Sequence, residues 1–207
     1  MPIYKSEKEA IRQHIDYEYD TDLEGKYQVG GHALFLYRAL KDVITPNSVV
    51  LDIGCNSGAI GRLLMADKNV ICYGIDVAPE MARRAALKGI FVRIGKAEHL
   101  PWPDNNFDAT ILMEILEHVY DPEMVFNEAV RVTKEGGIVT GSVPHPRGEA
   151  GAKGFRRHKY HARVFDKASL KQLLKTKLRK IEIKSIYTDP DLTALPNWLF
   201  FYGRKGG

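Results

Sequence analysis

The feature that most constrains the fold is a short apolar run that is followed by a turn of small and polar residues. The run covers Val49–Ile53 and contains one acid, Asp52, and a helical pattern begins at Ala59 after the turn. Such a run is typical of a strand that is buried on both faces, as in a parallel sheet. Glycines in the turn let the backbone approach a ligand, and the free N–H groups of the helix start point toward it. The stretch therefore predicts a strand, a ligand-binding turn and a helix.

Strand and helix patterns alternate along the rest of the chain. After the first strand we predict strands at 70–75, 90–94, 107–113, 138–143, 181–187 and 198–202. We predict helices at 29–44, 59–66, 79–88, 122–132 and 169–178. This order predicts a single α/β domain with a seven-stranded, mostly parallel sheet and helices on both faces.

The predicted domain covers residues 1–207 and has four parts. They are an N-terminal helical cap or lid over 1–45, a ligand-binding core over 47–143, a long functional loop over 144–165, and a C-terminal helix with closing strands over 166–207. The sequence does not indicate an oligomeric state.

The composition argues against a membrane-spanning, a secreted or a disulfide-rich protein. Hydrophobic residues make up 44% of the 207 residues, and no apolar run approaches the roughly 18 residues of a membrane span. The first residues lack the apolar core of a secretion signal, so we expect a cytoplasmic protein without a membrane span. Cys55 and Cys72 are too few for a disulfide framework, and we expect both to be reduced and buried.

Charge is distributed unevenly, although the net charge is only +4. Between residues 147 and 184 the basic side chains greatly outnumber the acids, which are Glu149, Asp166 and Glu182. Such a segment attracts phosphate, carboxylate or nucleic acid, and the alternative is a solvated helix face.

The carboxyl ends of parallel strands meet at one edge of a sheet, where ligands bind. Asp76 ends the second predicted strand, and a carboxylate there suits a ribose diol. A dinucleotide loop would have the pattern G-x-G-x-x-G, but position 56 is Asn and position 59 is Ala. Asp52 would also repel a pyrophosphate, and it suits a ligand with an amino group. A nicotinamide-dependent oxidoreductase is therefore disfavoured.

Five segments in order carry a family resemblance: residues 49–58, 74–81, 95–108, 117–122 and 132–137. Together they resemble the motifs of class I S-adenosylmethionine-dependent methyltransferases, such as the small-molecule enzymes of ubiquinone and menaquinone biosynthesis. The resemblance implies a Rossmann-like fold and S-adenosylmethionine as the methyl donor.

The resemblance also implies which residues bind the methyl donor. Asp52 and the backbone of Gly54, Cys55, Asn56 and Gly58 would hold the methionine part, and Asp76 would hold the ribose. The remaining contacts would come from Val77 and Met81 on the adenine ring, the Ala97 backbone N–H on an adenine nitrogen, and Met113 beneath the sulfonium. Plain core packing is the alternative for Val77 and Met81.

Two positions depart from the family pattern. Asn56 stands where the family often has glycine, but asparagine tolerates left-handed backbone angles. Lys96 stands where the family often has an aspartate that receives the adenine amino group, and lysine cannot accept a hydrogen bond. Either Glu98 takes over that contact or the contact is missing.

The residues that would surround the transferred methyl group follow the fourth predicted strand. If this stretch is helical, Glu114, Glu117 and His118 share one face. The pattern resembles one that holds a divalent metal in ubiquinone-pathway O-methyltransferases and in small-RNA 3′-end methyltransferases. A further ligand would come from His145, His158 or His161.

Three roles remain open for these side chains. One is metal binding by Glu114, Glu117, His118 and His161; another is catalysis by His118 as a general base, with Glu114 and His145 as further candidates. In the third, Glu117 and His118 only orient the next helix.

The functional prediction is methyl transfer to a small, anionic acceptor, with O-methylation ahead of N- or C-methylation. Cations on the long loop would favour such an acceptor; they are Arg147, Arg156, Arg157, Lys159 and Arg163. The alternatives are an RNA methyltransferase that uses the basic segment 147–184, and a non-catalytic nucleotide-binding module.

Overall fold

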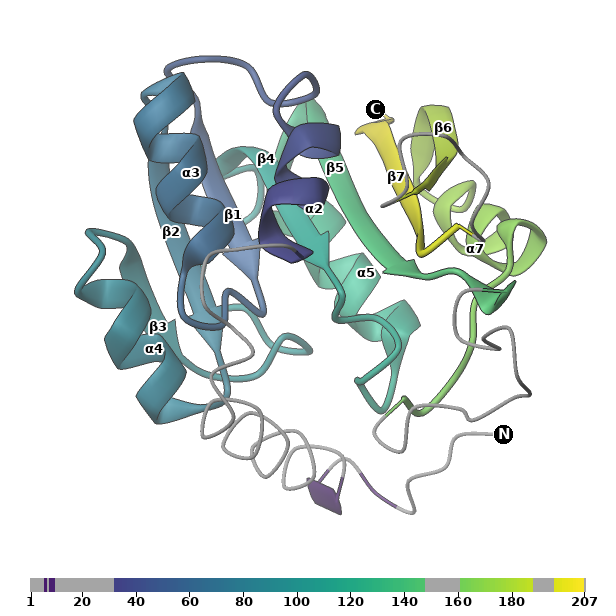
Figure 1. Cartoon of the computed structure of the whole chain (residues 1–207), viewed down its shortest axis with the longest axis horizontal. Coiled ribbons are helices and arrows are strands. Elements are labelled where there is room, and N and C mark those ends of the chain that lie inside the picture. Colours follow the sequence, from purple (N-terminus) through teal and green to yellow (C-terminus); the bar gives the residue numbers. More distant parts are fainter. Residues whose placement is uncertain (1–5, 7, 10–31, 148–160, 188–195, 207) are drawn as a thin grey trace.

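A seven-stranded sheet forms the centre of the computed structural model (Figure 1), which describes residues 6, 8–9, 32–147, 161–187 and 196–206. The strand order is β3-β2-β1-β4-β5-β7-β6. The strands are β1 Val49–Ile53, β2 Ile71–Asp76, β3 Phe91–Ile94, β4 Phe107–Met113, β5 Thr133–Pro144, β6 Leu178–Ile186 and β7 Trp198–Lys205. Only β7 runs antiparallel to its neighbours, β5 and β6. The predicted mostly parallel, Rossmann-like sheet is confirmed.

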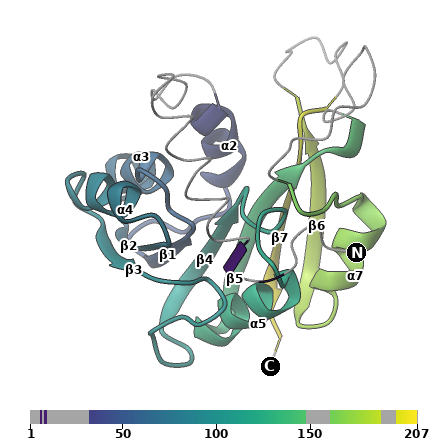
Figure 2. The same cartoon turned by 90° about the horizontal axis from the view of Figure 1, so that it is seen from below.

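Helices cover both faces of this sheet (Figures 1 and 2). The helices α2 His32–Leu40, α3 Ala59–Lys68 and α4 Pro79–Ala86 cover one face, and α5 Pro122–Val132 and α7 Lys167–Leu174 cover the other. The predicted first helix is described from His32 and ends at Leu40 rather than at residue 44, and of the cap before it only residues 6 and 8–9 are described. Among the residues that the structure describes, no helix is long and apolar enough to cross a membrane.

The central strand β1 owes its position to residues that are apolar on both faces. It pairs in parallel with β2 on one side and with β4 on the other. Val50 packs with α2 and α3, whereas Leu51 and Ile53 pack with α5, and all three are fully buried. The chain order reverses between β1 and β4, so the ligand crevice of such a sheet is expected beyond the end of β1.

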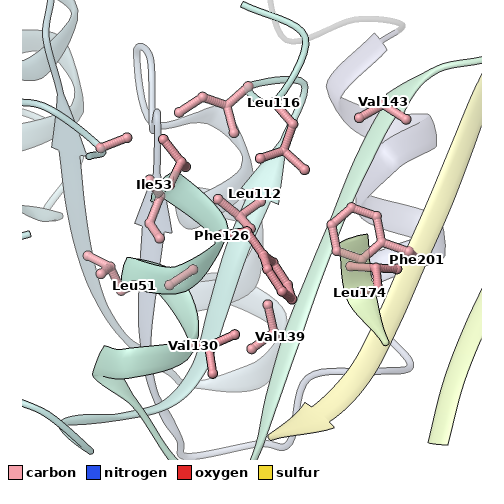
Figure 3. Close-up of a cluster of buried hydrophobic side chains, with 14 of the residues drawn as sticks. Leu51, Ile53, Leu112, Leu116, Phe126, Val130, Val139, Val143, Leu174 and Phe201 are labelled. Carbon is pink, nitrogen blue, oxygen red and sulfur yellow. The ribbon is translucent and has the colours of Figure 1, made fainter. Parts of the chain in front are cut away.

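The core on the α5 side is packed from α5, α7 and every strand except β3 (Figure 3). Phe126 of α5 lies over Leu112 of β4 and Val139 of β5, while Phe201 of β7 contributes to the same cluster. These side chains are all fully buried. The layer fixes β4 and β5 against α5, and it thereby holds the segment that follows β4.

Several boundaries differ from the prediction, most clearly at α7 and at the start of β5. The helix predicted over 169–178 is α7 Lys167–Leu174, which begins at an Asp166–Ser169 capping box. Leu178 instead starts β6. The strand predicted from residue 138 begins directly after α5, because Thr133 already pairs with Phe107 and an irregularity around Gly136, at φ 72°, interrupts the register.

Candidate functional site

The turn after β1 has the backbone geometry that a ligand-binding loop needs. Gly54, Asn56 and Gly58 have φ of 73°, 47° and 77°. A Cβ on Gly54 would lie 2.7 Å from the Ile115 side chain, so only glycine fits there. Asn56 occupies the left-handed region, as predicted for asparagine.

Asp76 holds this turn against the end of β2. One of its carboxylate oxygens accepts a hydrogen bond from the Asn56 backbone N–H at 2.8 Å, and the other accepts one from Ala78 at 2.9 Å. The carboxylate is buried. Because each carboxylate oxygen has a second lone pair, Asp76 retains acceptor capacity for a ligand diol.

Asp52 is a second buried acid on the same edge. Burial, and then the charge of Asp76, raise the pKa of Asp52 to about 7. Two buried carboxylates this close create a site that favours a cation. The amino group of a methionine moiety is such a cation, so the residues present fit the implied methyl donor.

This raised pKa predicts that the affinity for S-adenosylmethionine depends on pH. Below pH 7 Asp52 is protonated and cannot pair with an ammonium group, so we expect affinity to fall about tenfold per pH unit from pH 7 to pH 5. The folded pKa lies above the unfolded value of 3.8, so the ligand-free protein should lose stability as pH rises from 4 to 7.

Calorimetry between pH 5.5 and 8.5 measures the first effect, and thermal melts measure the second. Asp52→Asn should abolish both pH dependences and stabilise the ligand-free protein at pH 8. An affinity that stays flat across this range would contradict the assignment of Asp52.

An open cavity lies at this edge of the sheet; Asp76 lines it, whereas Asp52 is absent from its wall. Its walls come from the turn after β1, the end of β2, the segment after β3 and the segment after β4. The lining residues are Gly54, Ile75, Asp76, Val77, Gly95, Lys96, Ala97, Glu98, Ile115, His118, Val119 and Tyr120. Four segments that are distant in sequence therefore meet at one place, as predicted from strand order.

Five other predicted cofactor residues are absent from the cavity wall: Cys55, Asn56, Gly58, Met81 and Met113. Met81 of α4 and Met113 of β4 are buried, as is Cys55. Cys55 lies against Gly74, where an added Cβ would be 2.8 Å from its Sγ. Both cysteines are free and buried, and burial raises the pKa of each thiol. The roles predicted for Met81, Met113 and Cys55 stay predictions.

The adenine side of the predicted site contains Lys96, Ala97 and Glu98. Glu98 is buried and lines the cavity, while Lys96 is exposed at its rim. A buried carboxylate is thus available where Lys96 cannot accept a hydrogen bond.

The segment after β4 brings three titratable side chains together. Each of Glu117, His118 and His161 has one atom that could bind a metal, and these three atoms all lie within 4.8 Å of one another. Glu117 Oε1 lies 3.9 Å from His118 Nε2, and the rings of His118 and His161 are 4.7 Å apart in an edge-on arrangement. Glu117 and His118 are both buried.

Backbone hydrogen bonds bring His161 to this segment. Ala162 N–H donates to the Glu117 carbonyl at 2.7 Å, and the Arg163 guanidinium donates to the carbonyls of Val119 and Tyr120. These bonds tie the residues after the long loop to the wall of the cavity. Arg163 thus helps to hold this connection, and its predicted role toward an anionic acceptor stays a prediction.

The helical arrangement considered for Glu114, Glu117 and His118 is wrong. The segment after β4 forms turns, and Glu114 has a φ of 52°. Glu114 accepts a 2.6 Å hydrogen bond from Ser142 of β5 and does not join Glu117 and His118 in the cluster. A positive φ at a non-glycine residue is incompatible with a continuous α-helix. The hydrogen-bond partner of the Glu114 side chain comes from the neighbouring strand β5.

His145 follows the end of β5. Its backbone N–H donates to the Asn197 carbonyl, and its Nδ1 accepts a hydrogen bond from the Arg147 backbone. Burial lowers the pKa of His145, as do the charges of Arg147 and Lys167. His145 is absent from the cavity wall. His158, Arg156, Arg157 and Lys159 lie outside the described residues.

Sequence reasoning missed part of the cavity wall. Ile115, Val119 and Tyr120 line it, although they were not predicted as site residues. Their place in the segment that also contains His118 was the available signal.

Comparison with known proteins agrees with this geometry. The family model described as "Methyltransferase domain" matches residues 51–140. A probable S-adenosylmethionine-dependent methyltransferase of Mycolicibacterium smegmatis is 30% identical over 61% of this chain and 50% of its own length. A ubiquinone biosynthesis O-methyltransferase of Xanthomonas oryzae is 36% identical over 42% of this chain and 39% of its own.

A solved structure extends the likeness to nearly the whole fold. The S-adenosylmethionine-dependent methyltransferase of Thermotoga maritima superposes with a TM-score of 0.71 at 22% identity, over 93% of this chain and 99% of its own. The chain spans about half the length, or less, of the curated relatives it matches.

Residues 51–140 thus match a methyltransferase domain, within a fold that the chain shares with S-adenosylmethionine-dependent methyltransferases. The family predicted from the sequence and its methyl donor are thereby confirmed.

Proposed function

We propose that the protein transfers a methyl group from S-adenosylmethionine to a hydroxyl of a small, anionic acceptor. The observation that carries this proposal is the position of His118, which lines the same cavity as Gly54 and Asp76. A potential base thus lies in the wall of the compartment that would hold the donor. The similarity to an O-methyltransferase of ubiquinone biosynthesis supports the choice of oxygen as the methylated atom.

The chemistry divides between the donor and the protein. When bound, S-adenosylmethionine supplies a methyl group on a cationic sulfur, which is the difficult part of the reaction. The protein aligns the acceptor and removes its hydroxyl proton as the new oxygen–carbon bond forms. His118 accepts that proton, and Glu117, 3.9 Å from its ring, stabilises the resulting imidazolium.

Product analysis tests the acceptor class. The protein is incubated with radiolabelled S-adenosylmethionine and either a small-metabolite pool or total RNA. We expect label in anionic small molecules and none in RNA. Label that accumulates in RNA, with a turnover that falls steeply as salt increases, would overturn the proposed acceptor.

The position of the basic segment favours a small acceptor over RNA. Most of its described basic residues lie on α7 and β6, the edge strand opposite β3, although Arg163 lies against the segment after β4. The cavity instead borders the end of β3, at Gly95 and Lys96. A nucleic acid bound along α7 and β6 would therefore lie on the far side of the sheet from that wall.

In a second candidate role, the cluster of Glu117, His118 and His161 holds a divalent metal. The clustering of a carboxylate with two imidazoles supports this role, since such donors suit Mn, Fe or Zn. A metal there would bind two adjacent acceptor oxygens and lower a hydroxyl pKa.

Chelation separates the two roles. If His118 is the base, turnover of the EDTA-dialysed protein should equal that of the untreated protein, and added Mn²⁺ or Zn²⁺ should not raise it. A loss of activity that Mn²⁺ or Zn²⁺ restores in the wild type, but not in Glu117→Gln, would instead establish the metal. The cofactor-binding prediction stands in either case, because Asp52 and Asp76 lie outside this cluster.

A further inference from the structure

The edge strand β3 presents large apolar side chains to solvent. Phe91 and Ile94 are 60% and 64% exposed, and Leu87 at the end of the neighbouring helix α4 is 75% exposed. Ile71, at the start of the adjacent strand β2, is 49% exposed. Half of the eight exposed large hydrophobic side chains in the described part of the chain therefore lie at this edge, which Figure 2 shows beside α4.

The other edge of the same sheet is protected. The edge strand β6 alternates partly buried and exposed positions over residues 181–185 and carries Lys180, Glu182 and Lys184. Its pairing with β7 is irregular between Arg179 and Glu182, and Lys180 has a φ of 50°. Charges and bulges of this kind block the addition of another strand. On β3, in contrast, Arg93 is the one charged residue.

The charged side chains on β3 and directly beside it are basic. Arg83 and Arg84 of α4 pair with Glu80, whereas Lys88, Arg93 and Lys96 follow with no acid between them. A second copy of the chain that paired through β3 would bring two such basic segments together, which costs energy. An acidic partner would meet complementary charge.

We propose that β3 is a docking edge for another protein, which adds an extended strand with apolar side chains and acidic flanking residues. In such a complex the partner's backbone pairs with the free side of β3, and its apolar side chains cover Phe91 and Ile94. The acidic flanks lie near Lys88 and Arg93. The inference rests on the sheet edge alone and does not depend on the identity of the acceptor.

The binding of synthetic peptides to the full chain tests this proposal. The probe is a ten-residue peptide of alternating valine and threonine with two glutamates at each end, and its partner has lysines in place of the glutamates. We expect the acidic peptide to bind and to slow amide hydrogen exchange at residues 91–94. The lysine-flanked peptide should bind at least about tenfold more weakly.

Variants identify the surface. Phe91→Ser combined with Ile94→Ser should weaken the binding of the acidic peptide by about tenfold or more, whereas the control Met124→Ser should not. Met124 is a suitable control because it is 42% exposed on α5, away from this edge. Thermal melts verify that each variant is folded.

Three results would overturn the proposal. The first is no binding of the acidic peptide, or binding that the Phe91 and Ile94 variant does not weaken. The second is a dimer in analytical ultracentrifugation that the same variant dissociates, because the occupant would then be a second copy. The third is exchange at residues 91–94 that is already as slow in the free protein as in β1, because the chain itself would then cover the edge.

Discussion

Asp76→Ala is expected to weaken S-adenosylmethionine binding by at least about 100-fold. The carboxylate would accept two charge-assisted hydrogen bonds from the ribose diol, each worth about 1.5–3 kcal/mol. The substitution also frees the backbone N–H groups of Asn56 and Ala78, so the turn after β1 would loosen. Isothermal calorimetry measures the affinity, and unchanged affinity would refute the ribose assignment.

A second aspartate provides a matched control for the loss of backbone hydrogen bonds. Asp108 at the start of β4 accepts a 2.8 Å hydrogen bond from the Val49 backbone and pairs with Lys134 at 2.6 Å. It is absent from the cavity wall. Asp108→Ala should therefore destabilise the fold while leaving the affinity for S-adenosylmethionine within about twofold. An equal loss in both variants would assign the effect to stability alone.

His118→Ala is expected to lower kcat by a factor of about 10²–10⁴, the usual contribution of a positioned base. Binding of S-adenosylmethionine should change by less than the rate does, because Asp52 and Asp76 remain. The wild-type kcat should fall at acidic pH as the imidazole is protonated, and the variant should lack this fall. Steady-state kinetics from pH 5.5 to 9 measure both effects.

His99→Ala controls for the loss of an imidazole as such. His99 is exposed and is not part of the cavity wall. Its replacement should leave kcat and its pH profile unchanged. If His118→Ala kept the wild-type kcat with an unchanged pH profile, His118 would not be the base, and Glu117 and His118 would be left with a structural role.

The sheet was predictable because its strands carry their own signals. Residues 49–53 and 107–113 are apolar on both faces, and such runs define buried parallel strands without help from the rest of the chain. Boundaries were less predictable where tertiary pairing decides them. Thr133 becomes strand because Phe107 pairs with it, and Leu178 leaves the helix because β6 begins there.

The donor side of the site was also predictable, whereas the reacting end was only partly so. Asp76 and Ala97 follow strands whose ends must meet, so their convergence follows from the topology. Glu114 could not be placed, because its contact with Ser142 depends on the neighbouring strand. His161 reaches His118 through the Ala162 hydrogen bond, which joins segments more than 40 residues apart.

A calorimetric titration of the full chain with S-adenosylmethionine, and in parallel with NADH, tests the central claim most directly. At pH 8, where Asp52 is ionised, we expect one molecule of S-adenosylmethionine to bind and NADH not to bind. Asp52→Asn and Asp76→Ala should each weaken the binding of S-adenosylmethionine strongly. Tight binding of NADH with no response to S-adenosylmethionine would contradict the assignment of this cavity.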